Sequence, residues 1–451
     1  MPDAAPRLMN QLTAAEVRKL LVDGQVAPAE FFKQACAFLA AADEKVLAFS
    51  YRDDRIVDLQ VEHLQKARSA GELPGPLFGV PVAIKDIIDT EDFPTEYGSV
   101  IHKGRYSVGD ATVVLRLRAA GAVVMGKTVT TEFATTVPGP TRNPHALEHT
   151  PGGSSSGSAA AVAAGMVPLA IGTQTNGSVI RPASYCGVYG FKPSMGLIPR
   201  TGILNQSASL DQVGVFARNI DDIALVTELL IGDDGHDPAT RGQSPMRVVD
   251  VATSDPPLQP KFCFVKTPWW DQVSPEAQEA YDALVDHLEG CVELSGVPEV
   301  VSQAVAWHKQ VNEVELAFCL QKEWNHNRDQ LSPTLQARIA EGMQVPVMDY
   351  LLAIDRMSHV TSAFDAYFDE YDAILCPAAL GTAPQGLSST GDPIMSTVWS
   401  FAGLPTLSLP LMNLSNGLPL GVQVVGRHKH DARLLRSARW LVSEFLRRNQ
   451  A

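Results

Sequence analysis

Short apolar segments bounded by glycine or proline alternate with amphipathic helical segments along this chain. Residues 111–127, ATVVLRLRAAGAVVMGK, have the spacing of a helix that ends near Gly121 and is followed by a short buried strand. Further apolar runs of strand length occur at 167–174, 371–377, 404–410 and 419–426. Such alternation predicts an α/β fold in which helices cover both faces of a sheet of parallel strands.

The order of these segments predicts one large domain over residues 1–451. A helical segment over 1–45 opens the chain, because Thr13 followed by Glu16 is the capping-box pattern and apolar residues then recur at helical spacing. A mainly helical excursion covers about 274–372. The strand pattern returns after this excursion, so we expect the late strands to join the sheet of the early ones.

The composition indicates a globular chain and argues against several classes of protein. Of the 451 residues, 45% are hydrophobic and 19% are charged, which is enough apolar material for a large buried core. The formal net charge of −14, without a basic cluster, argues against a surface that follows nucleic-acid phosphates. No leader or membrane anchor is visible, and the six cysteines are scattered without a C-x-x-C pair, so we expect a cytoplasmic protein.

The segment GAVVMGKT, from Gly121 to Thr128, matches the phosphate-binding pattern G-x-x-x-x-G-K-[ST]. A phosphate-binding loop needs a strand before it, a helix after it, and backbone N–H groups that are free to face the phosphates. In this chain a helix precedes Gly121, and residues 122–125 form an expected strand whose N–H groups belong to a sheet. A nucleotide-binding protein that uses GAVVMGKT stays open as an alternative, although the local pattern argues against it.

Residues 150–165, TPGGSSSGSAAAVAAG, place three consecutive serines between glycines and a run of alanines. Gly153 to Gly157 fit the nucleophile pattern G-x-S-x-G with Ser155 at its centre, but no apolar strand precedes them to form the required strand–turn–helix. A purely structural loop at the start of an alanine-rich helix is the other interpretation. A second segment of small and hydroxyl residues, GTQTNGSVIRPASYCGVYGFKPS at 172–194, favours a reactive site that both segments share.

These two segments, together with SLDQVGVFARNIDD at 209–222, resemble the signature region of the amidase signature family. The likeness extends upstream to GVPVAIKDIID and GAVVMGKTVTTEFA, and downstream to ILCPAALGTAPQG and GLPTLSLPLMNLSNGLPLGVQVVG, so it covers most of the chain. The resemblance implies a single three-layer α/β/α domain around a large, mixed and twisted sheet. It also implies an amidase, which is a hydrolase that acts on linear C–N amide bonds.

The resemblance further implies a catalytic triad of one lysine and two serines, which are Lys85, Ser154 and Ser178 in this sequence. Ser178 matches the nucleophile, and Ser154, after a cis peptide bond, matches the serine that passes protons between Lys85 and Ser178. A serine hydroxyl is a weak nucleophile at neutral pH and needs a base. Lysine is a base only when neutral, so its pKa of about 10.4 has to fall by burial, which the apolar run before Lys85 favours. A surface lysine paired with Asp86 is the alternative.

The same matching implies further roles around the triad. Ser155 and Thr173 would hydrogen-bond the triad and orient it, and Ser156 would cap the alanine-rich helix. The expected reaction forms an acyl-enzyme on Ser178, releases ammonia or an amine, and ends with hydrolysis by water, without a metal or a cofactor. The oxyanion hole, which stabilises the charge on the amide oxygen, would consist of the backbone N–H groups of Thr175, Asn176, Gly177 and Ser178.

The sequence departs from the common family pattern around the nucleophile. Many members have aspartate where this chain has Gln174, glycine where it has Asn176, and arginine two residues after the nucleophile, whereas Arg181 is the third residue here. This variant resembles malonamidase and related small-amide hydrolases, in which the displaced arginine can pair with a substrate carboxylate. We therefore expect a small carboxamide or ureide substrate, with Arg181 as the anchor of a carboxylate and Gln174 as a second contact. Arg181 as a brace for the loop is an equal alternative.

Two other functions stay open. The glutaminase component of a tRNA-dependent amidotransferase has a similar signature with glutamine as its amide substrate, and the acidic charge does not exclude it because partner subunits could hold the tRNA. The nucleotide-binding protein considered above is the alternative from another class. For the main interpretation we expect a small-molecule amide as partner, no direct contact with nucleic acid or membrane, and a homodimer as one assembly that the sequence allows.

Overall fold

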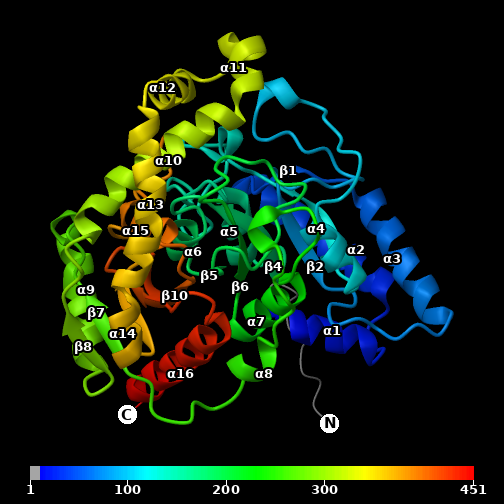
Figure 1. The fold of residues 1–451 in the computed structure, drawn as a ribbon. Coiled ribbons are helices and arrows are strands. Elements are labelled where there is room, and N and C mark those ends of the chain that lie inside the picture. The colour runs from blue at the N-terminus through cyan, green and yellow to red at the C-terminus, as the bar shows by residue number, and fades with distance from the viewer. Residues whose placement is uncertain (1–10, 451) are drawn as a thin grey trace.

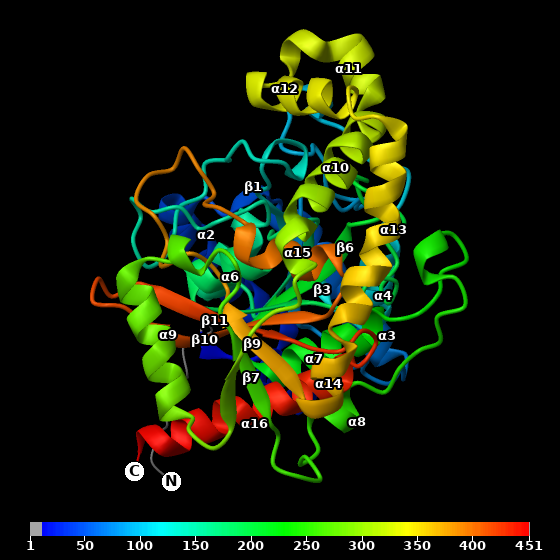
Figure 2. The same ribbon diagram turned by 60° about the vertical axis from the view of Figure 1, so that its left-hand side comes forward.

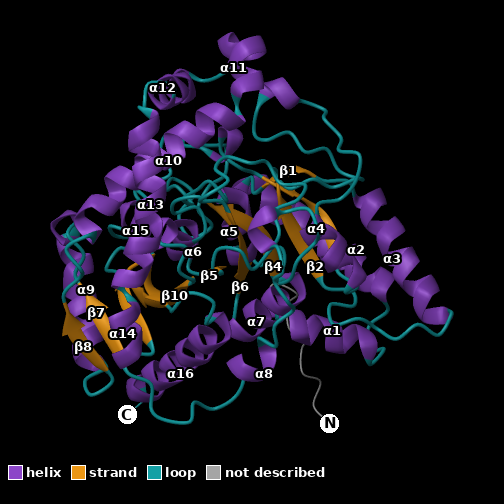
Figure 3. Ribbon diagram, viewed as in Figure 1, coloured by secondary structure: helices purple, strands orange, loops and turns teal. Residues whose placement is uncertain are grey.

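A large mixed sheet lies at the centre of the computed structural model, which describes residues 11–450 (Figure 1). Strands from both halves of the chain build this sheet, and helices surround it (Figure 3). Its eleven strands are, in spatial order, β1 (Phe49–Tyr51), β3 (Val123–Thr128), β2 (Pro81–Lys85), β4 (Leu169–Gln174), β6 (Gln212–Ala217), β5 (Tyr189–Lys192), β10 (Thr406–Asn413), β11 (Pro419–Val425), β9 (Ala373–Pro377), β7 (Phe262–Val265) and β8 (Val292–Ser295).

The pairing of the strands differs between the middle and the ends of the sheet. Strands β3, β2 and β4 are parallel, as are β9, β7 and β8, whereas every pair between β4 and β9 is antiparallel. The expectation of a parallel sheet is therefore wrong for the middle strands. The reason is that short returns such as 414–418, between β10 and β11, contain no crossover helix, and parallel strands require one. The mixed sheet that the family resemblance implies is confirmed.

Helices cover both faces of the sheet, and alternate residues of a strand belong to different cores. Along β2, Val82 and Ile84 pack into one core, and Ala83 packs into the core on the opposite face. The first core includes α4, α7 and α16, and the second includes α2, α5 and α6. The helices are α1 (Ala14–Val22), α2 (Pro28–Val46), α3 (Asp54–Ser69), α4 (Thr112–Ala119), α5 (Ser156–Ala163), α6 (Ile180–Cys186), α7 (Ile220–Leu230), α8 (Val249–Ala252), α9 (Pro275–His287), α10 (Val301–Cys319), α11 (Gln321–Asn327), α12 (Pro333–Gly342), α13 (Val347–Ala363), α14 (Asp365–Glu370), α15 (Ile394–Phe401) and α16 (Asp431–Asn449).

Helices α10, α11, α12 and α13 extend beyond the sheet. Figure 2 shows α10 and α13 running side by side away from the strands, with α11 and α12 at their far end. Helix α10 also packs against α15, and both helices share a core with β7 and β9, so the helical excursion packs back onto a face of the sheet. No helix within residues 11–450 is long and apolar enough to cross a membrane.

Candidate active site

Two neighbouring parallel strands, β2 and β4, bring Lys85 and Thr173 to the same edge of the sheet. Ala83 pairs with Ala170 and Ile84 with Ile171, so both strands end close together. Lys85 is the last residue of β2, and Thr173 is the last but one of β4. The carboxyl edge of such strands is where open α/β sheets commonly place their ligands.

The amine of Lys85 is fully buried, and its hydrogen-bond partners within residues 11–450 are two hydroxyl groups. Its Nζ donates to Ser154 Oγ at 2.7 Å and to Thr173 Oγ1 at 2.8 Å. Burial lowers the pKa of Lys85 to about 7, and the negative charge of Asp211 opposes this shift. The alternative of a surface lysine paired with Asp86 is wrong, because Asp86 lies beside Lys127 instead. A substantial fraction of Lys85 is therefore neutral at neutral pH and can accept a proton.

The three serines of the first loop have three different sets of contacts. Ser154 follows a cis peptide bond from Gly153 and bonds to Lys85. Ser155 Oγ donates to the carbonyl of Thr173 at 3.1 Å and accepts the N–H of the same residue at 3.3 Å. Ser156 donates to the carbonyl of Gly152 at 2.9 Å, and helix α5 has no side-chain cap. The prediction that Ser156 caps this helix is therefore wrong, because the residue is already inside the first turn.

The second loop carries Ser178, whose half-buried hydroxyl has no hydrogen-bond partner within residues 11–450. Gln174 holds this loop in place: its Oε1 accepts the N–H groups of Val179 at 2.7 Å and Ile180 at 3.0 Å, and its Nε2 donates to Ser400 Oγ at 2.9 Å. Because Gln174 is fully buried and both ends of its amide are used in this way, the geometry gives it a bracing contact rather than a substrate contact.

The backbone N–H groups of Thr175, Asn176, Gly177 and Ser178 have no partner among the residues that the structure describes. Four consecutive unpaired donors beside a hydroxyl form a site that suits an anionic oxygen. A Cβ at Gly177 would lie 2.9 Å from both Arg181 Nη1 and Pro393 Cβ, so only glycine fits between them.

A cavity of about 310 Å³ opens beside this loop, which is a size that suits a small ligand. One of its walls is the signature region, and the other is formed by helices α10 and α12 together with the segment before α15. The residues that line it include Ser178, Arg181, His308, Asn312, Thr390 and Asp392.

Arg181 is a buried cation without an ion-pair partner in the described part of the chain. Its Nε donates to the carbonyl of Thr390 at 2.7 Å and its Nη2 to the carbonyl of Gly153 at 2.7 Å. The third nitrogen, Nη1, is buried without a partner and lies next to Gly177. The guanidinium therefore braces both loops and still has one donor at the cavity.

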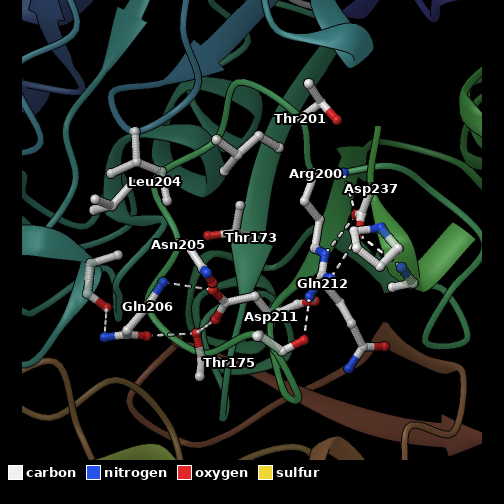
Figure 4. Close-up of a pocket in the computed structure, with 16 residues that line it drawn as sticks. Thr173, Thr175, Arg200, Thr201, Leu204, Asn205, Gln206, Asp211, Gln212 and Asp237 are labelled. Carbon is white, nitrogen blue, oxygen red and sulfur yellow. Dashed lines mark hydrogen bonds and ion pairs between the residues drawn. The ribbon is translucent and has the colours of Figure 1, made fainter. Parts of the chain in front are cut away.

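A second cavity of about 560 Å³ lies behind the same loop (Figure 4). It is lined by Thr173 and by Thr175, whose hydroxyl oxygen lies 2.6 Å from both Gln206 Oε1 and Asp211 Oδ1. Ala134, Thr175 and Gln206 line both cavities, so these side chains form the wall between them.

The phosphate-loop interpretation of GAVVMGKT is excluded by its place in the fold. Residues 123–128 are strand β3, which lies between β1 and β2, so their N–H groups face neighbouring strands. The Lys127 amine is buried and donates to the carbonyl of Ile88 and to Thr95 Oγ1 at 2.6 Å. No part of this segment is available for a nucleotide.

Sequence reasoning did not find the helical wall of the small cavity. Trp399 does not line this cavity, because it packs in the core against Phe364, with ring centroids 4.9 Å apart. His308 and Asn312 line the cavity from α10 instead. Both lie on a helix of mixed composition, and a single sequence contains no signal that singles them out.

A family model described as Amidase matches residues 30–435. The chain belongs to the amidase family. The enzyme class predicted from the signature is thereby confirmed: the protein acts on amide C–N bonds. The curated relatives include the A subunit of the glutamyl-tRNA(Gln) amidotransferase from Agathobacter rectalis, which is 34% identical over 95% of this chain and 92% of its own length.

Several solved structures have the same fold. A protein from a vestigial complex, described with the evolutionary origins of an s-triazine catabolic enzyme, superposes with a TM-score of 0.89 at 28% identity, over 96% of this chain and 98% of its own. A peptide amidase in complex with the competitive inhibitor chymostatin superposes with a TM-score of 0.85 at 27% identity, over 98% of both chains.

The relatives correct one prediction. The sequence predicts no direct contact with nucleic acid, but the matching relatives are named as subunits of a glutamyl-tRNA(Gln) amidotransferase, a name that includes both a tRNA and further subunits. The prediction is wrong because it rests on the net charge of −14. The charge of one chain reports on that chain's own surface, and it does not report on a nucleic acid that another protein of the complex holds.

Proposed function

We propose that this amidase hydrolyses a small, carboxylated carboxamide or ureide through an acyl-enzyme on Ser178. The observation that carries the proposal is the buried Lys85 amine, bonded to Ser154 at 2.7 Å and with a pKa near neutrality. A general base works best when its pKa lies near the working pH. Beside it, the Ser178 loop offers a free hydroxyl and unpaired N–H groups at a cavity of matching size, all within the described residues.

In the proposed first step, Ser178 Oγ attacks the carbonyl carbon of the amide. Its proton passes to Ser154 as the Ser154 proton passes to Lys85, which becomes an ammonium group. The carbonyl oxygen gains a negative charge, and the N–H groups of residues 175–178 stabilise it. When the C–N bond breaks, the leaving nitrogen takes the proton back through Ser154, so Lys85 is neutral again.

In the proposed second step, a water molecule is the nucleophile and attacks the acyl-enzyme. Lys85 accepts a proton from the water through Ser154, and the resulting hydroxide attacks the acyl carbon. The bond to Ser178 then breaks, and the proton returns to Ser178 Oγ. Thr173 and Ser155 position the Lys85 amine. Thr173 accepts a hydrogen bond from Lys85, and Ser155 bonds to both the carbonyl and the N–H of Thr173.

We further propose that Arg181 binds the substrate carboxylate through Nη1. A buried cation without a counter-ion is costly, and an anionic ligand would offset that cost. The carboxylate of Asp392 also faces the cavity but is exposed and does not pair with Arg181 within the described residues.

Replacing Arg181 with alanine should change the preference for charged amides. A hydrogen bond to a charged group contributes about 1.5–3 kcal/mol, so we expect kcat/KM for malonamate to fall about 10–100-fold more than kcat/KM for a neutral amide of the same length. Ammonia release from a panel of malonamate-, carbamoyl- and aryl-type amides measures this ratio. If both substrates lose activity equally, Arg181 is only a brace for the loops.

The relatives favour a second function, the glutaminase component of a tRNA-dependent amidotransferase. Its reaction at Ser178 would be the same, with glutamine as the amide. The two functions differ in what the purified chain does alone. A free-standing hydrolase releases ammonia from simple amides at full rate, whereas a glutaminase component should need partner chains, so a rate that rises more than about tenfold with those partners would favour the second function.

We also propose that residues 1–451 act as one amidase domain and that the protein is cytoplasmic. One sheet takes strands from both halves of the chain, which supports the first point. All six cysteines are unpaired thiols, which supports the second, because secreted proteins commonly form disulfides. Limited proteolysis that releases a stably folded fragment would argue against a single domain.

A further inference from the structure

The carbonyl groups of the Ser178 loop are bonded to side chains from two distant helices. His308 Nε2 on α10 lies 3.1 Å from the carbonyl oxygen of Thr175, and the hydroxyl of Ser400 on α15 donates to the carbonyl of Asn176. The next carbonyl, that of Gly177, accepts the N–H of Arg181 at 3.1 Å. Each peptide group of this loop is therefore held from the side of its oxygen.

Because the peptide bond is planar, a contact that fixes a carbonyl oxygen also fixes the direction of the N–H group in the same peptide. In a trans peptide the C=O and the following N–H point in opposite directions. The contact of His308 with the Thr175 carbonyl therefore directs the Asn176 N–H away from His308. In the same way, Ser400 fixes the direction of the Gly177 N–H. These are two of the N–H groups that have no partner within residues 11–450.

We infer that His308 and Ser400 are positioning residues that align the oxyanion hole of this amidase. The inference rests on the proposed function, in which Ser178 is the nucleophile and these N–H groups stabilise the oxyanion. Preorganised donors of this kind lower the activation barrier because they do not have to reorient when the negative charge forms. The two residues therefore contribute to the rate without contacting the reacting atoms.

The chemistry of both contacts fits a fixed orientation. Burial lowers the pKa of His308 to about 4, so the ring is neutral at neutral pH and has a single N–H. A carbonyl oxygen only accepts, so that N–H is on Nε2. Ser400 Oγ accepts from Gln174 Nε2 and donates to the Asn176 carbonyl, which gives one continuous chain of hydrogen bonds from Gln174, the residue that also binds the N–H groups beyond Ser178.

The test compares substitutions that remove or keep each donor. We expect His308→Leu and Ser400→Ala each to lower kcat about 10–100-fold with KM changed less than about threefold, because removal of one whole oxyanion donor costs about 10²–10³-fold. His308→Gln, whose amide can place an N–H near the position of Nε2, should restore most of the rate. Ser396→Ala is the matched control, since it removes from α15 a buried hydroxyl that has no partner among the described residues, and it should keep the wild-type rate.

The affinity for a boronic acid, which forms a tetrahedral anionic adduct with the nucleophile, distinguishes a misaligned oxyanion hole from a general loosening of the fold. This affinity should fall in parallel with kcat in His308→Leu and Ser400→Ala, while the affinity for the carboxylic acid product stays constant. The inference is overturned if both variants keep kcat within twofold, or if both affinities fall equally. If His308→Leu does not fold, the kcat and the two affinities of Ser400→Ala alone test the inference. A wild-type enzyme that the boronic acid does not inhibit, together with an active Ser178→Ala variant, would contradict the proposed function instead.

Discussion

Replacing Ser178 with alanine should abolish amide hydrolysis and labelling by a fluorophosphonate probe together. The side chain has no hydrogen-bond partner within the described residues, so its loss should leave the fold and the melting temperature unchanged. Loss of a serine nucleophile lowers kcat by about 10⁴–10⁶-fold, and the remaining rate comes from binding and the oxyanion hole. Ammonia release and gel fluorescence after labelling measure the two effects.

Ser156→Ala is the matched control for this experiment. Ser156 lies in the more conspicuous triple serine, but its hydroxyl only donates to the carbonyl of Gly152. We expect this variant to keep its labelling and an activity of the same order as the wild type. Burst-phase acylation that persists in Ser178→Ala would assign the nucleophile to another residue.

Replacing Lys85 with methionine should also cause a large, but smaller, loss of activity. Methionine fills the same buried space without an amine, and the loss of a general base costs about 10²–10⁴-fold in kcat. The wild-type enzyme should also show the titration of this group. The neutral amine is the active form, so kcat/KM rises as the pH rises through the pKa of about 7 and falls about tenfold for each pH unit below it.

The pH profile and a double variant make the role of Lys85 falsifiable. The residual activity of Lys85→Met should have lost the limb near pH 7 that the wild type shows. Groups that act as one unit are not additive, so Lys85→Met combined with Ser178→Ala should be no slower than Ser178→Ala alone. A Lys85→Met variant with an unchanged pH profile would show that another group titrates, and Lys85 would then have a structural role.

Much of the candidate site could be predicted because the segments that contain Lys85, Ser154 and Ser178 resemble the amidase signature, which implies their roles. Lys85 ends a strand that is recognisable as an apolar run, and Ser154 and Ser178 lie in two loops of unusual composition. The GAVVMGKT segment could be interpreted correctly for a related reason. Its residues match a nucleotide-binding loop, but the helix before it and the strand within it do not. In both cases the neighbouring segments of the chain indicate the correct structure.

The remaining parts could not be predicted because they depend on contacts between distant segments. His308 reaches Thr175 across 133 residues, and Ser400 reaches Asn176 across 224. Neither helix has a motif at these positions. The sequence does not decide between the two roles of Arg181 for a similar reason: its partner Thr390 is 209 residues away, and the number of free guanidinium nitrogens depends on that loop.

In this account the reacting hydroxyl belongs to Ser178, and the triple serine supplies the proton relay and its support but not the nucleophile. Mass spectrometry of the fluorophosphonate-treated protein tests this claim most directly, by intact mass and then by peptide mapping. We predict one adduct per chain, located on Ser178, and absent when Lys85 is replaced by methionine under the same conditions. An adduct on Ser154, Ser155 or Ser156 would contradict the assignment.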